Sequence, residues 1–259
     1  MLTPVLDKTL PAWRFTTFRP PHLLTRPIEE FFSGSLGDDF RALLAHFPKT
    51  YSIYLVGGVV RDLALRELKE INRPVGDVDL AVVGASSKAE VEAALGDLPR
   101  KVNRMGGLKI RVRKEGPVFD LWRVEDHLNV GESGPPFTIE KLLRYFLLDI
   151  DALAWDTANL NLYDYGGIAS IEAERIDLLG TRGISAAMAP VQAAHIMAIA
   201  YSTGFKLSNR ATALIRNAWQ SSRRGEIISV LKDKQRGYPE EVLEWYRDTI
   251  ENPRERSGA

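Results

Sequence analysis

Two aspartates, Asp77 and Asp79, are separated by a single residue just before an apolar run at 80–83. On a β-strand, residues two apart point to the same face, so these carboxylates would lie side by side. Neighbouring like charges raise each other's pKa unless a cation lies between them, and Mg²⁺ or Mn²⁺ prefers oxygen ligands. Two solvated acids at the start of a strand are the alternative. Because the following residues have the composition of a buried strand, a divalent metal site is the favoured interpretation.

A third acid, Asp120, interrupts the apolar run at 118–122. An acid inside such a run is either a residue at the edge of a strand or part of a site. Beside Asp77 and Asp79 it would complete a two-metal centre for phosphoryl transfer. In such a centre one ion activates an attacking hydroxyl and the other holds a triphosphate.

Two glycines, Gly57 and Gly58, lie between a short apolar run and a helical pattern at 59–68. Glycine lets the backbone approach a ligand closely, and a helix N-terminus offers free N–H groups and a positive dipole end to phosphates. A tight turn without a ligand is the alternative. Arg61 and Asp62 follow in what we expect to be the first helical turn, where the dipole favours an acid.

The hydrophobic pattern around these residues alternates between helix and strand. Helical spacing predicts helices at residues 38–46, 59–68 and 88–95. Strand candidates occur at residues 52–56, 78–83, 108–113 and 118–124. This order is typical of an α/β domain.

The two ends of the chain have different patterns. The first 27 residues contain five prolines, which disfavour helix and interior strand, so we expect an extended arm. Helices are predicted in the later part at 138–148, 191–203, 209–221 and 240–250. The predicted organisation is an arm at 1–27, an α/β domain at 28–170 and an α-helical module at 171–259.

Composition excludes several classes of site. Of 259 residues, 45% are apolar, which is enough for a sizeable core. Lys+Arg and Asp+Glu are both 34, so overall charge requires neither a nucleic-acid nor a membrane partner. The absence of cysteine excludes disulfides and thiolate catalysis, and four scattered histidines argue against a histidine-built metal centre. Without a signal-peptide pattern, and with the most apolar stretch (186–201) interrupted by polar residues, we expect a cytoplasmic protein with no membrane partner.

Five segments together resemble a known family. Residues 55–62 (Leu-Val-Gly-Gly-Val-Val-Arg-Asp) and 77–80 (Asp-Val-Asp-Leu) are similar to a two-part signature, Gly-Gly-x-x-Arg-Asp followed by Asp-x-Asp. That signature belongs to the head domain of poly(A) polymerases and CCA-adding tRNA nucleotidyltransferases of the bacterial and eukaryotic class. Residues 150–156 resemble the end of the family's Arg-Arg-Asp-Phe-Thr-Ile-Asn-Ala-Leu-Ala motif, 164–167 its Asp-Pro-Phe-Gly-Gly turn, and 204–208 the Gly-Phe-x-Ile that closes the first neck helix.

The resemblance implies an α/β nucleotidyltransferase (polymerase β-like) head domain with a small mixed sheet, followed by an α-helical neck module. It also implies transfer of a nucleoside monophosphate from an NTP to a hydroxyl, with release of pyrophosphate and with Mg²⁺ or Mn²⁺ as cofactor. The metals would be bound by three catalytic carboxylates: Asp77, Asp79 and Asp120. The nucleotide would be bound by residues from several motifs: Gly57, Gly58, Arg61, Asp62, Arg144, Asp151 and Gln192.

The chain departs from the family in the motif before residue 152. Residues 145–147 (Tyr-Phe-Leu) align with Arg-Arg-Asp, and Asp151 aligns with the terminal Asn. Contacts to phosphate and ribose would therefore be lost, unless Arg144, one residue upstream, partly substitutes.

A second departure concerns the nucleobase. The family reads cytosine and adenine with Glu-Asp-x-x-Arg, whereas residues 188–192 here are Met-Ala-Pro-Val-Gln. Gln192 keeps one donor and one acceptor, which permits only weak base pairing. The chain also ends after three or four neck-like helices, so we do not expect it to grip the full length of a tRNA.

Two basic segments are candidates for contact with RNA. Residues 100–114 contain seven Lys or Arg and no acid, and residues 206–224 contain five and no acid, with Trp219 available to stack on a base. Solvated strand and helix faces are the alternative. The candidate residues are Lys109, Arg111, Arg113, Arg216, Arg223 and Arg224. His195, on a helix rich in Ala and Ile, is interpreted as a packed core or interface histidine and not as a catalyst.

Three functional hypotheses remain open. The leading one is metal-dependent nucleotidyl transfer to the 3′ end of an RNA. The second is the same chemistry on a small-molecule or protein hydroxyl, and the third is a non-catalytic homologue that binds RNA or nucleotide. The intact carboxylates favour an enzyme, whereas the altered motifs favour divergence.

Overall fold

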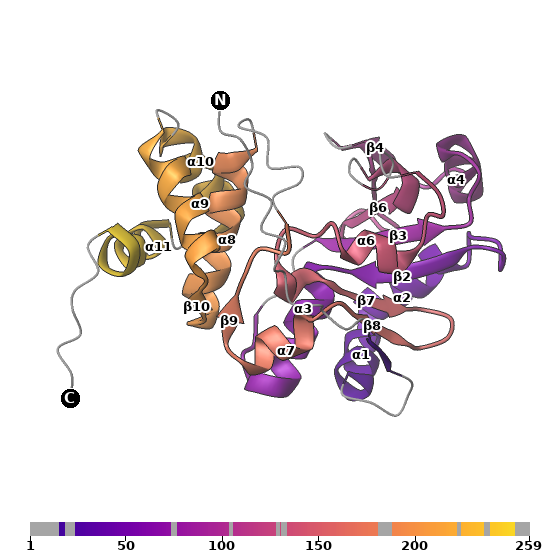
Figure 1. The fold of residues 1–259 in the computed structure, drawn as a ribbon. Helices are drawn as coiled ribbons and strands as arrows, with labels where there is room; N and C mark the ends of the chain where they lie inside the picture. The colour runs from indigo at the N-terminus through magenta and orange to yellow at the C-terminus, as the bar shows by residue number, and fades with distance from the viewer. Residues whose placement is uncertain are drawn as a thin grey trace.

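A large mixed sheet is the central feature of the fold (Figure 1). The computed structural model describes residues 16–18, 24–73, 77–103, 106–127, 130, 134–180, 188–221, 224–235 and 239–251. Within these residues, eight strands form the sheet in the order β1-β8-β7-β2-β3-β6-β5-β4. Their bounds are β1 (Thr16–Phe18), β2 (Ser52–Val56), β3 (Val78–Val83), β4 (Arg100–Val102), β5 (Leu108–Ile110), β6 (Phe119–Arg123), β7 (Leu153–Asp156) and β8 (Leu162–Asp164). Strands β3 and β6 are parallel, and the other neighbouring pairs are antiparallel.

Alternation along the strands gives the sheet two different faces. On β2, Ile53 and Leu55 belong to one hydrophobic core, while Tyr54 and Val56 belong to another. The first core is built with α1 (Thr25–Phe31), α2 (Gly34–Leu44), α3 (Gly58–Lys69), α4 (Lys88–Leu95) and α7 (Gly167–Glu172). Of the helices with described bounds, the second core includes the short α6 (Ile139–Leu143) and the 3₁₀ turn η1 (Val124–Asp126). Fewer of the described helices therefore pack on the second face, and this leaves room for polar side chains.

The last part of the described chain is helical and stacks beside the sheet region (Figure 1). The helices are α8 (Ala189–Thr203), α9 (Asn209–Gln220), α10 (Arg224–Gln235) and α11 (Pro239–Tyr246), followed by the π-helical turn η3 (Arg247–Glu251). Helix α8 packs against the other three, which explains its nearly uniform apolar composition. A short parallel pair, β9 (Arg175–Ile176) with β10 (Lys206–Leu207), joins the segment after α7 to the segment after α8. None of the helices described is long and apolar enough to span a bilayer.

The predicted α/β fold class is confirmed, and several elements lie where the pattern placed them. The strands at 52–56 and 78–83 and the helix at 88–95 have the predicted bounds. The strand predicted at 108–113 ends at Ile110, so Arg111 and Arg113 do not lie on a strand face with Lys109. The helix predicted at 138–148 ends at Leu143, because Leu148 forms a bridge with Leu178 and the chain continues into a 3₁₀ turn, η2 (Asp149–Asp151).

The prediction of an extended arm at 1–27 is wrong in its last residues. Helix α1 begins at Thr25 and includes Pro27 in its first turn, where a missing backbone N–H costs no intrahelical hydrogen bond. Strand β1 forms the edge of the sheet, against β8. The rest of the predicted arm lies outside the described residues. The domain borders at 27 and 170 remain predictions.

Candidate active site

Strand register brings the acids together on the second face of the sheet. Asp79 of β3 is the cross-strand partner of Asp120 on the parallel strand β6. Asp77 precedes β3 by one residue and is two residues from Asp79, so it has the same orientation along the strand. The Asp77 side chain is 55% exposed and that of Asp120 only 14%. The three carboxylates thus lie on the same face of two adjacent strands. Asp77 is the most exposed of them, and Asp120 is largely buried.

The ammonium group of Lys109 lies between two of these acids. Lys109 on β5 is the cross-strand partner of Asp120. Its Nζ donates to Asp77 Oδ2 at 2.8 Å and lies 3.3 Å from Asp120 Oδ2. The other oxygen of Asp120, Oδ1, accepts a hydrogen bond of 2.6 Å from Asn103 Nδ2, and Asn103 Oδ1 in turn accepts from Gly107 N. Both oxygens of Asp120 are therefore engaged.

The pKa values of Asp79 and Lys109 reflect the opposite charges gathered in this cluster. Burial, together with the negative charges of Asp120 and Asp77, raises the pKa of Asp79 to about 7. Burial alone would lower the pKa of Lys109, but its contacts with Asp77 and Asp120 outweigh this and raise it. The cluster therefore favours a positive charge at the position of Lys109.

The donor chemistry of the cluster fits Mg²⁺ or Mn²⁺, which prefer carboxylate oxygens. An ammonium that contacts two of the carboxylates at once shows that these oxygens jointly attract a cation. Within the part of the chain that is described, no group of three or more His, Asp or Glu side chains already converges as a metal cage. A metal would thus be held by Asp77, Asp79 and Asp120 after their side chains turn toward it.

A cavity of about 270 Å³ opens beside Asp79 and Asp120. Its wall includes the aromatic side chains of Trp122, His127 and Phe146. Trp122 and His127 contact each other, with ring centroids 5.4 Å apart. Such a surface can stack on a flat aromatic ligand next to the carboxylates.

Sequence reasoning missed these aromatic residues and also Asn103. Trp122 is two residues after Asp120 on β6, so strand alternation could have placed it on the acid face. His127 and Phe146 follow short helical turns, and no periodic pattern indicates where such residues point.

Gly57 and Gly58 form the turn from β2 into α3, as predicted. Gly57 has φ of 65° and ψ of −127°, a conformation that disfavours any residue with a side chain. A Cβ atom there would lie 2.9 Å from Cε1 of Phe146, so the glycine also allows the aromatic ring to approach. The turn therefore connects the N-terminus of α3 with the wall of the cavity.

Replacing Gly57 by Ala is expected to lower the free energy of unfolding by about 1–3 kcal/mol through backbone strain, and to weaken NTP binding because Phe146 must move. Gly96→Ala is a matched control, because Gly96 has φ of 54° and ψ of −127° but no atom within 4 Å of the added Cβ. Urea unfolding and NTP titration measure the two effects. The two variants share the strained backbone, so similar losses of stability are expected; an equal loss of NTP affinity in Gly96→Ala would contradict the role of the Phe146 contact.

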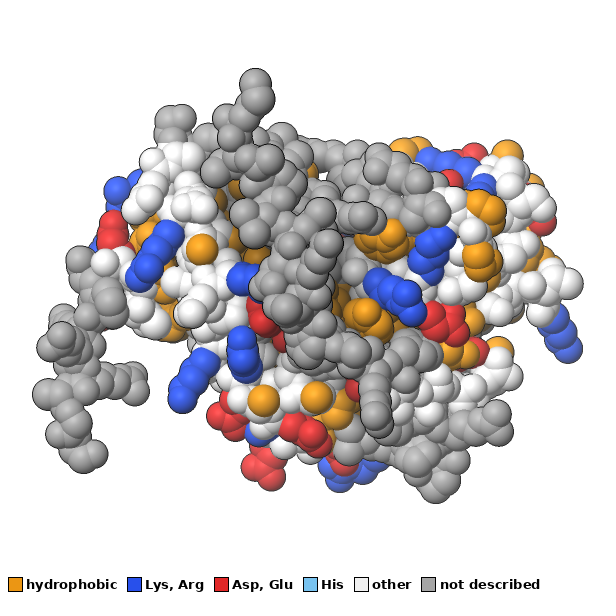
Figure 2. Space-filling model, viewed as in Figure 1, with side chains coloured by type: hydrophobic (Ala, Val, Ile, Leu, Met, Phe, Trp, Pro, Cys, Tyr) orange, Lys and Arg blue, Asp and Glu red, His pale blue; other side chains and the backbone are white. Residues whose placement is uncertain are grey.

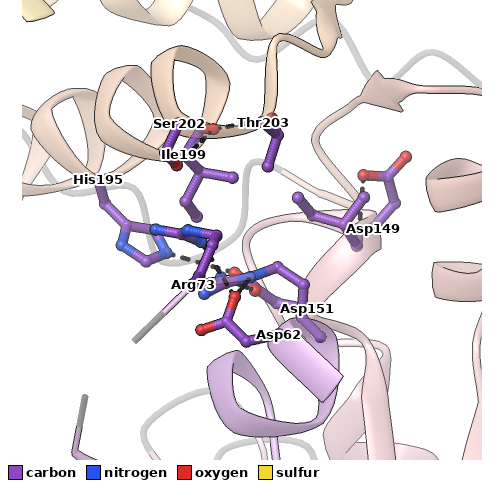
Figure 3. A network of polar contacts seen from close by, with 10 residues as sticks. Asp62, Arg73, Asp149, Asp151, His195, Ile199, Ser202 and Thr203 are labelled. Carbon is purple, nitrogen blue, oxygen red and sulfur yellow. Dashed lines mark hydrogen bonds and ion pairs between the residues drawn. The ribbon is translucent and has the colours of Figure 1, made fainter. Parts of the chain in front are cut away.

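Arg61, predicted as a triphosphate ligand, is buried in a network of ion pairs. Its Nε donates to Asp62 Oδ1 at 2.9 Å, and its Nη1 donates to Asp151 Oδ1 at 2.5 Å. Arg73 adds a second bond to Asp62 at 3.0 Å, and His195 of α8 lies 3.3 Å from Asp151 Oδ2 (Figure 3). The Arg61 side chain is only 5% exposed, so contact with a phosphate would require breaking buried ion pairs.

This network also determines the charge state of Asp151. Burial alone would raise its pKa, but the charges of Arg61 and His195 and their hydrogen bonds lower it to about 2. The prediction that Asp62 lies in the first turn of α3 is wrong. The helix begins at Gly58, so Asp62 lies in its second turn. Of the two alternatives expected for His195, core or interface, the structure fits the interface: its side chain is 35% exposed and contacts Asp151 from α8.

The other predicted nucleotide ligands, Arg144 and Gln192, form no hydrogen bond or ion pair with the three carboxylates among the described residues. The guanidinium of Arg144 is exposed and lies 5.6 Å from the ring centroid of Tyr165. Gln192 lies on the first turn of α8, and its buried Oε1 accepts no hydrogen bond from the described residues.

Four of the residues predicted to contact RNA already make contacts within the protein. Arg111 donates to the backbone of Gly116, and Arg113 forms an ion pair with Asp39. Arg216 donates to Ile250 O, and Arg224 stacks on the ring of Trp219 at 4.3 Å. Arg223 lies outside the described residues. Figure 2 shows basic side chains over both the helical part and the sheet part of one face, with acidic side chains among them.

Comparison with known proteins identifies relatives of this chain. No family model matches it. It is 31% identical over 194 residues to the Multifunctional CCA protein of Stenotrophomonas maltophilia strain K279a, covering 70% of this chain and 43% of that protein. The protein of the same name from Xanthomonas campestris pv. campestris strain B100 is 31% identical over 189 residues, with the same coverage. This chain therefore spans less than half the length of these relatives.

Solved structures agree with the sequence comparison. A tRNA nucleotidyltransferase crystallised with a primer tRNA and an incoming ATP analog has a TM-score of 0.55 and 25% identity, covering 76% of this chain and 57% of that chain. An apo form of a CCA-adding enzyme has a TM-score of 0.61 and 20% identity, covering 87% of this chain and 53% of that chain, which supports the fold alone. Shared sequence over 70% of the chain, on a shared fold, makes it a divergent member of the CCA-adding tRNA nucleotidyltransferase family.

Proposed function

We propose that this chain transfers a nucleoside monophosphate from an NTP to the 3′ hydroxyl of an RNA and releases pyrophosphate. The observation that carries the proposal is the side-by-side placement of Asp79 and Asp120, with Asp77 at the same end, on the framework of a nucleotidyltransferase family. The adjacent aromatic cavity supports it, because a nucleoside can stack there while its phosphates extend toward the carboxylates.

Each part of the site has a defined task in this proposal. Asp77, Asp79 and Asp120 hold Mg²⁺ or Mn²⁺, which when bound neutralises charge on the triphosphate and lowers the pKa of the attacking hydroxyl. Backbone N–H groups at the N-terminus of α3, after Gly57 and Gly58, bind the phosphates.

The remaining predicted ligands have tasks that follow from their contacts. Arg61, Asp62 and Asp151 position the helix and η2 through buried ion pairs rather than by touching phosphate. Arg144 and Gln192 do not line the cavity beside the carboxylates, and their assignment as nucleotide ligands rests on the family resemblance alone. The RNA backbone is contacted by arginines of the two basic segments, the exposed Arg111, Arg113, Arg216 and Arg224 together with Arg223, which lies outside the described residues.

The test is the release of pyrophosphate from each of the four NTPs, with and without RNA. We expect release that depends on RNA and discriminates weakly among NTPs, since residues 188–192 offer no charged edge to a base. A bidentate pair contributes about 1–3 kcal/mol of discrimination, so preferences should be flatter than in the relatives by roughly ten- to a hundredfold.

Each of the other outcomes has a definite meaning. A strict order of CTP before ATP would show that other residues read the base. Release without RNA would point to a small-molecule or protein acceptor. No release from any NTP, with NTP or RNA still bound, would identify a non-catalytic binding protein.

A further inference from the structure

We propose that the ammonium of Lys109 and a divalent cation compete for the same carboxylate oxygens, so that metal binding displaces Lys109 from Asp77 and Asp120. This inference rests on the proposed function, because it takes those acids as metal ligands. It assigns to Lys109 the role of an internal counter-ion of the active site rather than that of an RNA contact.

The contacts of Lys109 show why the two cations exclude each other. Nζ is 2.8 Å from Asp77 Oδ2 and 3.3 Å from Asp120 Oδ2, so it lies where oxygens of both acids face one another. A magnesium ion bound to these oxygens would lie about 2.0–2.1 Å from each. Two cations so close to the same oxygens would repel strongly, and the ammonium must leave when the metal enters.

The surroundings allow that exchange. The Lys109 side chain is 39% exposed and has a flexible stem, so it can turn into solvent. Asp120, in contrast, is also held by Asn103 through Oδ1. Departure of the lysine therefore leaves Asp120 in place, with one oxygen free for the metal.

The strand next to β5 offers a matched control. Lys101 on β4 is the cross-strand partner of Lys109, so its side chain leaves the sheet on the same face. It is exposed, and it lies one strand farther from Asp120. Removing its charge changes the net charge of the protein as much as removing that of Lys109, without freeing Asp77 or Asp120.

The experiment measures Mn²⁺ affinity of the full chain by electron paramagnetic resonance and calorimetry, without substrate. We expect Lys109→Met to bind Mn²⁺ at least about tenfold more tightly than wild type, which corresponds to about 1.4 kcal/mol. Lys109→Arg and Lys101→Met should stay within about threefold of wild type. Adding Asp79→Asn to Lys109→Met should abolish the gain, which shows that the ion binds at these acids.

A second measurement uses the wild-type protein and amine labelling followed by mass spectrometry. Mn²⁺ should increase labelling of Lys109 several-fold and leave that of Lys101 unchanged. Equal Mn²⁺ affinities of wild type and Lys109→Met, with unchanged labelling, would overturn the competition while leaving the metal site intact. Failure of every variant to bind Mn²⁺ would overturn both the metal site and the competition.

Discussion

Asp79→Asn is expected to lower the rate of nucleotidyl transfer at least about a thousandfold, because a metal contributes several kcal/mol of charge stabilisation at the transition state. Asparagine keeps the size of the side chain but supplies only a neutral carbonyl oxygen. Asp77→Asn should have an effect in the same direction. Pyrophosphate release under single-turnover conditions measures the loss.

The fold should survive the change at Asp79. Burial and two neighbouring carboxylates raise the pKa of Asp79 to about 7, so its charge does not stabilise the folded protein. Circular dichroism should therefore match that of wild type, and the thermal midpoint at neutral pH should be at least as high. Asp97→Asn is the control for loss of one exposed carboxylate in the same region. Turnover near the wild-type rate in both Asp77→Asn and Asp79→Asn would refute the catalytic assignment.

Arg61→Met is expected to lower the free energy of unfolding by about 3–5 kcal/mol, because it leaves the buried carboxylates of Asp62 and Asp151 without their shared cation. Urea unfolding followed by fluorescence measures the loss. The matched control is Arg41→Met, which removes an exposed ion pair with Asp38 and should cost about 0–1 kcal/mol. A loss below about 1 kcal/mol in Arg61→Met would show that the network contributes little to stability.

The same network predicts a dependence of stability on pH. The pKa of Asp151 is lowered from 3.8 to about 2 in the folded protein. A carboxyl group with a depressed folded-state pKa stabilises the fold above its unfolded pKa and loses this contribution as the pH falls toward the folded value. Wild-type stability should therefore decline between about pH 4 and pH 2, and Arg61→Met should show less of this decline.

Local sequence determined the features that need only one element. The spacing of Asp77 and Asp79 places them on one face of any strand. The glycines at 57–58 end a strand and begin a helix, since their backbone freedom is a property of the residues themselves. The helix at 88–95 appears at its predicted residues because its pattern and its N-cap serine, Ser87, are both local.

The weakly patterned strands could not be found in this way. Strand β7 is buried along its whole length, so it has no polar alternation to detect. Strands β1, β4 and β8 have three residues each, which is too short for a period to emerge. Pairing with neighbours made them strands, and pairing is decided by tertiary contacts.

Tertiary structure alone decided what the charged residues contact. The sequence presented Lys109 as one basic residue among seven in 100–114 and Arg61 as part of a phosphate motif. Register between β5 and β6 placed Lys109 against Asp120, and the packing of α3 against η2 buried Arg61 beside Asp151. Residue type determines the sign of a charge, whereas the partner that balances it depends on which distant segments the fold brings within about 4 Å.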